Sequence, residues 1–154
     1  MMPCVPRPER HLIAADPQAV RDLLLALEAG TQMAALTPDS RECALLVLAE
    51  ALNNVVEHGY PDAVGWIGLL PVPGRAGLAW RIVDAGRPVP ELAQLRVAMP
   101  DGPAEGGFGW PLIRALTDEV RLSRRRGWNI LTLRMRRAEG VLPCQDGVSA
   151  GVVA

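Results

Sequence analysis

Two segments in the first half of the chain repeat apolar residues at the spacing of an α-helix. The first is predicted from about Pro17 to Met33, and it begins with Asp16 as a capping carboxylate before a proline. The second is predicted from Thr37 to about His58, where a glycine and a proline end it. The face of this second helix that we expect to pack on a sheet consists of Leu45, Leu48, Ala49, Leu52, Val55 and Val56.

Short runs of β-favouring residues predict strands before and after these helices, and a third helix is expected to begin near Trp110-Pro111. The order strand, two helices, two strands, loop, helix, two strands predicts an α+β fold. In this fold three main helices form one layer on a mixed, mostly antiparallel sheet. The predicted strands are 9–15, 65–70, 78–84, 120–124 and 128–136, the last two joined by a tight turn.

Between the third strand and the third helix, Ala85–Gly106 is rich in proline and glycine. This composition predicts a long irregular loop with one helical turn around Leu92–Val97, and loops of this length in small domains are usually functional. We expect residues 9–137 to fold as one domain. Residues 1–8 are expected to form a flexible N-terminus, and the small, glycine-rich residues 138–154 a disordered tail.

Composition and charge argue against several classes of protein. The 154 residues include 16 basic and 17 acidic side chains, a net charge of −1, which argues against a protein that binds a nucleic-acid backbone. All the basic residues are arginine, so P-loop and protein-kinase-like sites, which use a lysine on phosphate, are excluded in their usual form. Cys4, Cys43 and Cys144 lie too far apart for a zinc motif, and no signal peptide or membrane span is visible. We expect a soluble cytoplasmic protein.

The second predicted helix carries a polar sector beside its apolar face, formed by Glu50, Asn53, Asn54 and Glu57. A solvated face is the ordinary explanation of such a sector. Two adjacent asparagines, however, are unfavourable in a helix, and the sector contains no arginine in an arginine-rich chain. An amide oxygen is an acceptable ligand for Mg²⁺ shared with phosphates, and a glutamate one turn earlier can serve as a base.

Two further segments carry candidate chemistry. Asp84 ends a predicted strand and Gly86 follows, so a carboxylate can accept a hydrogen bond from an exocyclic amine while a flat ring approaches the glycine. A plain turn is the alternative. In Gly106–Pro111, three glycines precede a helix start, where backbone N–H groups can bind an anion, although a flexible loop explains the same composition.

Taken in order, E-A-L-N-N-V-V-E-H-G-Y, I-V-D-A-G, G-G-F-G-W-P-L-I and G-W-N-I-L-T-L resemble the GHKL ATPase superfamily. Within it, the chain is similar to the small bacterial anti-sigma-factor serine kinases, over about Asp16 to Arg136. The resemblance implies a Bergerat-type two-layer α/β sandwich that binds ATP and Mg²⁺ between helices and a lid.

The resemblance also assigns roles to particular residues. Glu50 matches the catalytic glutamate, Asn54 the magnesium-binding asparagine and Asp84 the adenine-reading aspartate. His58, Gly59 and Tyr60 match the family's H-G-Y, with the histidine more structural than catalytic. The remaining nucleotide-binding matches are Gly86 in the adenine pocket, Gly106, Gly107 and Gly109 at the phosphates, and Asn129 in the closing strand pair.

The chain departs from the family in the lid, where Asp101 and Glu105 stand near the place of a serine or threonine pair and a basic residue. Two functions therefore stay open. One is a kinase that phosphorylates a serine of an antagonist protein and sequesters a sigma factor; the other is a non-kinase, ATP-dependent binding switch. A sensor histidine kinase fits less well, since no helix pair bearing a phosphoacceptor histidine is visible. The expected partners are a sigma factor, its antagonist, or a second copy of the chain, without direct contact to nucleic acid or membrane.

Overall fold

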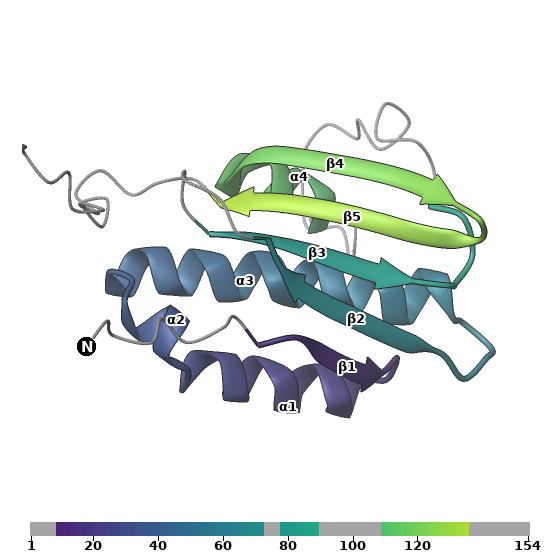
Figure 1. The fold of residues 1–154 in the computed structure, drawn as a ribbon, viewed down its shortest axis with the longest axis horizontal. Helices are drawn as coiled ribbons and strands as arrows, with labels where there is room; N and C mark the ends of the chain where they lie inside the picture. The colour runs from purple at the N-terminus through teal and green to yellow at the C-terminus, as the bar shows by residue number, and fades with distance from the viewer. Residues whose placement is uncertain (1–8, 73–77, 90–108, 136–154) are drawn as a thin grey trace, which may run out of the picture.

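The computed structural model describes residues 9–72, 78–89 and 109–135. In these ranges five strands form one sheet in the order β1-β2-β3-β5-β4, with every neighbouring pair antiparallel. The predicted α+β fold is confirmed, and the described sheet is antiparallel throughout rather than mixed (Figure 1). The strands are β1 His11–Ala14, β2 Trp66–Pro71, β3 Ala79–Asp84, β4 Thr117–Arg125 and β5 Trp128–Met135.

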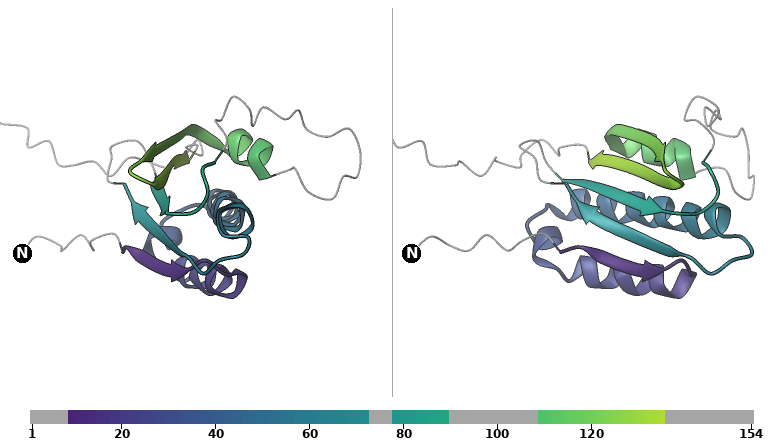
Figure 2. Two further views of the ribbon diagram at one scale, coloured as in Figure 1. Left: turned by 90° about the vertical axis from the view of Figure 1, so that its right-hand side faces the viewer. Right: turned by 45° about the vertical axis from the view of Figure 1, so that its right-hand side comes forward.

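All described helices cover one face of the sheet (Figure 2). Helix α3 lies in the centre of this layer, with α1 packed on one side and α4 on the other. Its buried side chains meet those of the three central strands and form a hydrophobic core with them. The helices are α1 Pro17–Glu28, α2 Thr31–Ala34, α3 Pro38–Asn54 and α4 Gly109–Leu116.

The two predicted helix starts are confirmed. Asp16 accepts a hydrogen bond from the N–H of Ala19 at 2.9 Å, and Thr37 accepts one from Ser40 at 3.3 Å. The predicted end of the first helix at Met33 is wrong. The chain leaves the helix after Glu28 and starts the short α2 with Gly30 as its extended N-cap, because a glycine inside a helix is costly.

The packing face of α3 differs in part from the prediction. Leu48, Leu52 and Val55 are buried as expected, but the other expected members, Leu45, Ala49 and Val56, are only half-buried. The remaining buried positions of α3 are Ala44, Val47 and Ala51. The central helix therefore turns small side chains to the sheet, while part of its leucine-rich side faces α1.

The second helix also ends differently from the expectation of a helix reaching His58. After Asn54 the chain widens into a π-helical turn, Val55–Gly59. Such turns are rare and are frequent at functional sites. The turn delivers the backbone of Gly59 to the loop after β3, where its carbonyl accepts a hydrogen bond from the N–H of Arg87 at 2.9 Å.

The C-terminal hairpin fixes the pairing of three strands. Arg126 and Gly127 have φ values of 51° and 85°, as in the two-residue type I′ turn that matches strand twist. The turn sets Arg124 opposite Asn129, and β5 in turn sets Asn129 opposite Asp84. Strand β4 begins directly after α4, three residues before the predicted Val120, with Thr117 Oγ1 donating to the carbonyl of Ile113 at 2.6 Å.

Several predictions fall outside the described residues. They are the helical turn at 92–97, most of the loop 85–106, the glycines Gly106 and Gly107, and both termini. Within the described ranges, no helix has the length and apolar character needed to cross a membrane.

Candidate functional site

A cavity of about 380 Å³ opens between the end of α3, the end of β3, the start of β5 and the start of α4. Its size is that of a small-molecule pocket, and its walls are mainly apolar with a few converging polar groups. Three of the predicted site residues meet there: Asn54, Asp84 and Asn129. The other lining residues are Ala51, Val55, His58, Gly59, Arg87, Pro88, Val89, Trp110, Leu122 and Leu131.

Asp84 is the buried carboxylate of this cavity, with only 3% of its surface exposed. Its Oδ1 accepts two hydrogen bonds of 2.8 Å, one from the N–H of Gly86 and one from Nδ2 of Asn129. Among the described residues both bonds fall on Oδ1. Oδ2 is therefore left to accept a hydrogen bond from a ligand, as an amine-reading carboxylate requires.

Asn129 is held from behind by a residue that the sequence did not point to. Arg124 donates through one guanidinium nitrogen to Asn129 Oδ1 at 2.6 Å and to the carbonyl of Gly86 at 3.1 Å. The amide of Asn129 also donates to the carbonyl of Arg87 at 2.9 Å. The available signal was the hairpin itself, since its two-residue turn places these two positions opposite each other.

Gly86 is required by its packing against Gly59. A β-carbon placed on it would lie 2.7 Å from the carbonyl oxygen of Gly59 and 2.8 Å from the carbon. Gly86 is not among the described residues that line the cavity. The glycine therefore permits the turn after α3 to rest against the loop after β3, and this contact places Asp84 beside Gly59.

Glu50, Asn54 and Gly109 converge where α4 begins. A β-carbon on Gly109 would lie 2.9 Å from Glu50 Oε2 and 3.4 Å from Asn54 Nδ2. The N-terminus of α4 thus sits directly against the carboxylate and the amide of α3. An N-terminal helix turn attracts phosphate, so these three residues form a polar corner suited to an anion and its metal.

The polar sector that the sequence treats as one face is divided in the structure. Asn54 lines the cavity, whereas the neighbouring Asn53 faces the groove between α1 and α3. Glu57 is exposed, and its carboxylate lies 3.8 Å from the imidazole of His58 at the surface. Consecutive helical residues are about 100° apart, which separates the two asparagines. Only Glu50 and Asn54 of the sector belong to the site.

Tyr60 supports the site through hydrogen bonds to the backbone. Its hydroxyl accepts a hydrogen bond from the N–H of Ala85 at 2.8 Å and donates to the carbonyl of Trp66 at 3.3 Å. Its ring packs against Gly65 and fills the space that a β-carbon there would need. Tyr60 therefore connects the residue after Asp84 to the start of β2.

The donor set fits a magnesium nucleotide. Asn54 Nδ2 is buried and has no hydrogen-bond partner in the described part of the chain. Rotating the amide by 180° presents its oxygen instead, the ligand that Mg²⁺ accepts. No group of three or more His, Cys, Asp or Glu side chains able to hold a metal occurs among the described residues.

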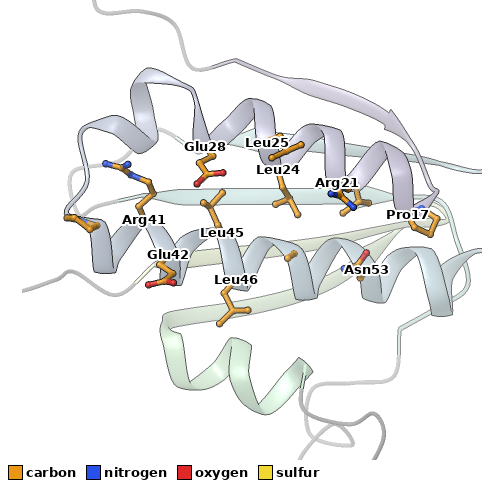
Figure 3. Close-up of a pocket in the computed structure, with 13 residues that line it drawn as sticks. Pro17, Arg21, Leu24, Leu25, Glu28, Arg41, Glu42, Leu45, Leu46 and Asn53 are labelled. Carbon is orange, nitrogen blue, oxygen red and sulfur yellow. The ribbon is translucent and has the colours of Figure 1, made fainter.

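A second, larger groove of about 660 Å³ runs between α1 and α3, on the side of the helices away from the sheet (Figure 3). Leu24 and Leu45 point toward each other across it, and charged side chains such as Arg21 and Glu28 stand beside them. Of the polar sector it holds only Asn53, so it is separate from the polar corner.

A comparison with models of known protein families agrees with the geometry of the site. The family model of the histidine kinase-like ATPase domain matches residues 13–135, from within β1 to the end of β5. A search among curated proteins finds no match.

Proposed function

The chain belongs to the histidine kinase-like ATPase domain family, and from this premise we propose that it is an ATP- and Mg²⁺-binding serine kinase of the anti-sigma-factor type. Membership of the family implies ATP binding by the domain. The proposal adds that the protein phosphorylates a serine of a partner antagonist protein and sequesters a sigma factor.

The two ends of the site support nucleotide binding. At the buried end, the free Oδ2 of Asp84 is an acceptor for the exocyclic amine of adenine. At the other end, Asn54 would hold the metal and the first N–H groups of α4, beginning at Gly109, would receive phosphate oxygens. We assign Gly106 and Gly107 to the same phosphate contact on the strength of their sequence positions.

The observation that carries the kinase proposal is the contact of Glu50 with the start of α4. Bound Mg·ATP would supply the phosphoryl group and the metal charge that such transfers need. Glu50 Oε2 lies beside Gly109, so the carboxylate is near the phosphate end of the site. There it can orient a serine hydroxyl and accept the proton that the hydroxyl loses. A domain that only binds nucleotide does not need a carboxylate at this point.

A second candidate function is a binding switch that uses ATP without phosphorylating its partner. The acidic residues Asp101 and Glu105 in the lid favour it, because they replace groups that would attract phosphate. The same nucleotide site serves both functions.

One experiment separates the two functions. The chain is used to capture partners from its native cytosol, and the captured mixture is incubated with Mg²⁺ and γ-labelled ATP. Transfer of label to a serine of a captured protein supports the kinase, and a Glu50→Gln chain that captures the same protein without labelling it is the control. ATP-dependent capture with no labelling overturns the kinase in favour of the switch.

A further inference from the structure

At the buried end of the cavity, β3 and β4 end on either side of the start of β5, and each of the three strands contributes one polar side chain to a continuous row. Asp84 of β3 is paired with Asn129 of β5, which is paired with Arg124 of β4. Hydrogen bonds of 2.8 Å and 2.6 Å join the row. Arg124 lies at the exposed end of β4, outside the cavity lining, so it acts on the site only through its neighbours.

The hydrogen bonds of this row can run in only one direction, from Arg124 to Asn129 and from Asn129 to Asp84. A guanidinium carries only donors, so the atom of Asn129 that faces Arg124 must be Oδ1. Nδ2 is consequently turned to two acceptors, Asp84 Oδ1 and the carbonyl of Arg87. Asp84 Oδ1 is filled by this amide and by the N–H of Gly86. Each bond therefore leaves Asp84 Oδ2 as an acceptor pointing to whatever occupies the cavity.

We propose that Arg124 is a positioning residue that sets the base preference of the site for a 6-amino purine over a 6-oxo purine. This role rests on the proposed nucleotide binding. Arg124 is the only donor to Asn129 Oδ1 among the described residues, and it also ties the carbonyl of Gly86 to β4. Without it, a buried acceptor is unpaired and the loop 84–87 is freed at one end. Asp84 Oδ2 then loses its fixed direction, which an amino group needs and a 6-oxo group does not use.

The test compares ATP with inosine triphosphate, which differs at position 6 of the base and keeps the same ribose and triphosphate. Equilibrium dissociation constants of both, with Mg²⁺, are measured for the full chain and for Arg124→Met, Arg124→Lys and Asn129→Ala. Arg125→Met is the matched control, because Arg125 is the next residue of β4, on the opposite face of the strand, paired with Trp128. Thermal unfolding of each variant without nucleotide checks that it folds.

We expect Arg124→Met to weaken ATP about tenfold and inosine triphosphate less than about twofold. Arg124→Lys should recover part of the discrimination, and Arg125→Met should match the wild type. Adding Arg124→Met to Asn129→Ala should weaken ATP less than Arg124→Met does in the wild type, because the two residues share the bond that leads to Asp84 and only the bond of Arg124 to Gly86 is left to lose. In the nucleotide-free protein, exchange of the Asn129 side-chain amide protons should speed up in Arg124→Met and not in Arg125→Met.

Equal weakening of both triphosphates overturns the proposal, since it would assign Arg124 to the phosphates or to the general fold. An unchanged ratio in Arg124→Met, or additive effects in the double variant, also overturns it. If the wild type binds neither triphosphate, the proposed nucleotide function itself fails and this role fails with it. The first three results leave nucleotide binding intact, so the two failures are distinguishable.

Discussion

Asp84 and Asn129 are direct cross-strand neighbours on β3 and β5, and the amide of Asn129 donates to Asp84 Oδ1 at 2.8 Å. Both side chains are buried, with 3% and 2% of their surfaces exposed. The bond uses one oxygen of the carboxylate and leaves the other to a ligand. The carboxylate that we propose to read the nucleotide is therefore oriented by strand pairing before any ligand arrives, which would lower the cost of binding.

Replacing Asp84 with Asn tests this reading directly. Mg·ATP should raise the melting temperature of the wild type, because a ligand that binds only the folded state stabilises it. Asp84→Asn should lose most of that increase, since the NH2 that replaces one carboxylate oxygen would face a donor: the adenine amine, or else the Gly86 and Asn129 N–H groups. The measurement is a thermal-shift titration to millimolar Mg·ATP, with Asp22→Asn on the exposed face of α1 as control. A wild type that does not shift contradicts the prediction.

Glu50 and Asn54 should separate chemistry from binding. Glu50→Ala should leave the affinity for Mg·ATP nearly intact and slow phosphoryl transfer by about 10²–10⁴, the usual worth of a positioned general base. Asn54→Ala should instead weaken the binding of Mg·ATP, because it would remove the proposed metal ligand. Single-turnover assays with the captured partner report the chemical step free of product release. Equal losses of affinity in both variants would place Glu50 in the binding shell alone.

Gly109→Ala should disturb the site more than the fold. The added β-carbon would meet the end of the flexible Glu50 side chain at 2.9 Å, and alanine is a better helix residue than glycine. We expect a melting temperature equal to or above that of the wild type, together with weaker Mg·ATP binding because Glu50 and Asn54 are pushed aside. Urea denaturation and nucleotide titration of the same sample check both parts. A destabilised variant would contradict this account of the contact.

Gly86→Ala should instead disturb the stability of the fold. Its β-carbon would meet the backbone of Gly59, at 2.7 Å from the oxygen, and backbone cannot move aside cheaply. We expect a loss of about 1–3 kcal/mol in the free energy of unfolding, as for other overpacked sites. Gly68→Ala is the matched control, because its β-carbon would meet only ordinary contacts at 3.8 Å or more. Similar urea midpoints for the two variants would argue against a close Gly59–Gly86 contact.

The acid stability of the outer face of the sheet should depend on Glu119. A hydrogen bond from Arg134 and the charge of Arg121 lower the pKa of this carboxyl below its ordinary value. The folded pKa is below the unfolded one, so the pair stabilises the fold above the unfolded pKa and stops doing so as the pH falls through the folded pKa. Glu119→Gln should therefore lower the urea midpoint at neutral pH and converge with the wild type in strong acid. A constant difference at all pH values would contradict this.

Much of the fold could be predicted because its signals are local. Asp16 with Pro17 and Thr37 with Pro38 mark helix starts by capping chemistry that acts within one turn. The π turn after Asn54 could not be predicted, since its residues also suit an α-helix. The packing face of α3 was partly missed because small residues such as Ala44 and Ala51 give a weak apolar signal, although they permit the closest approach to the sheet.

The residues of the site show the same contrast between local signals and long-range packing. Glu50, Asn54 and Asp84 could be singled out because each belongs to a short motif, and the structure brings Glu50 and Asn54 together at Gly109. Arg124 could not, because its role comes from two strand pairings, of Asp84 with Asn129 45 positions away and of Asn129 with Arg124 5 positions away. Asn53 was grouped with Asn54 because only the packing of α1 shows that the two face different cavities.

The type I′ turn at Arg126 and Gly127 limits how this gene can change in length. Exposed hairpin tips are ordinarily where a domain accepts inserted residues. Here the two-residue tip also sets which side chain of β4 stands opposite Asn129. Loop length fixes hairpin register. One extra residue at the tip would therefore shift Arg124 out of register with Asn129 without changing any residue that lines the cavity. Relatives that retain Arg124 and Asn129 as a pair should therefore vary the identity of the tip residues but conserve their number.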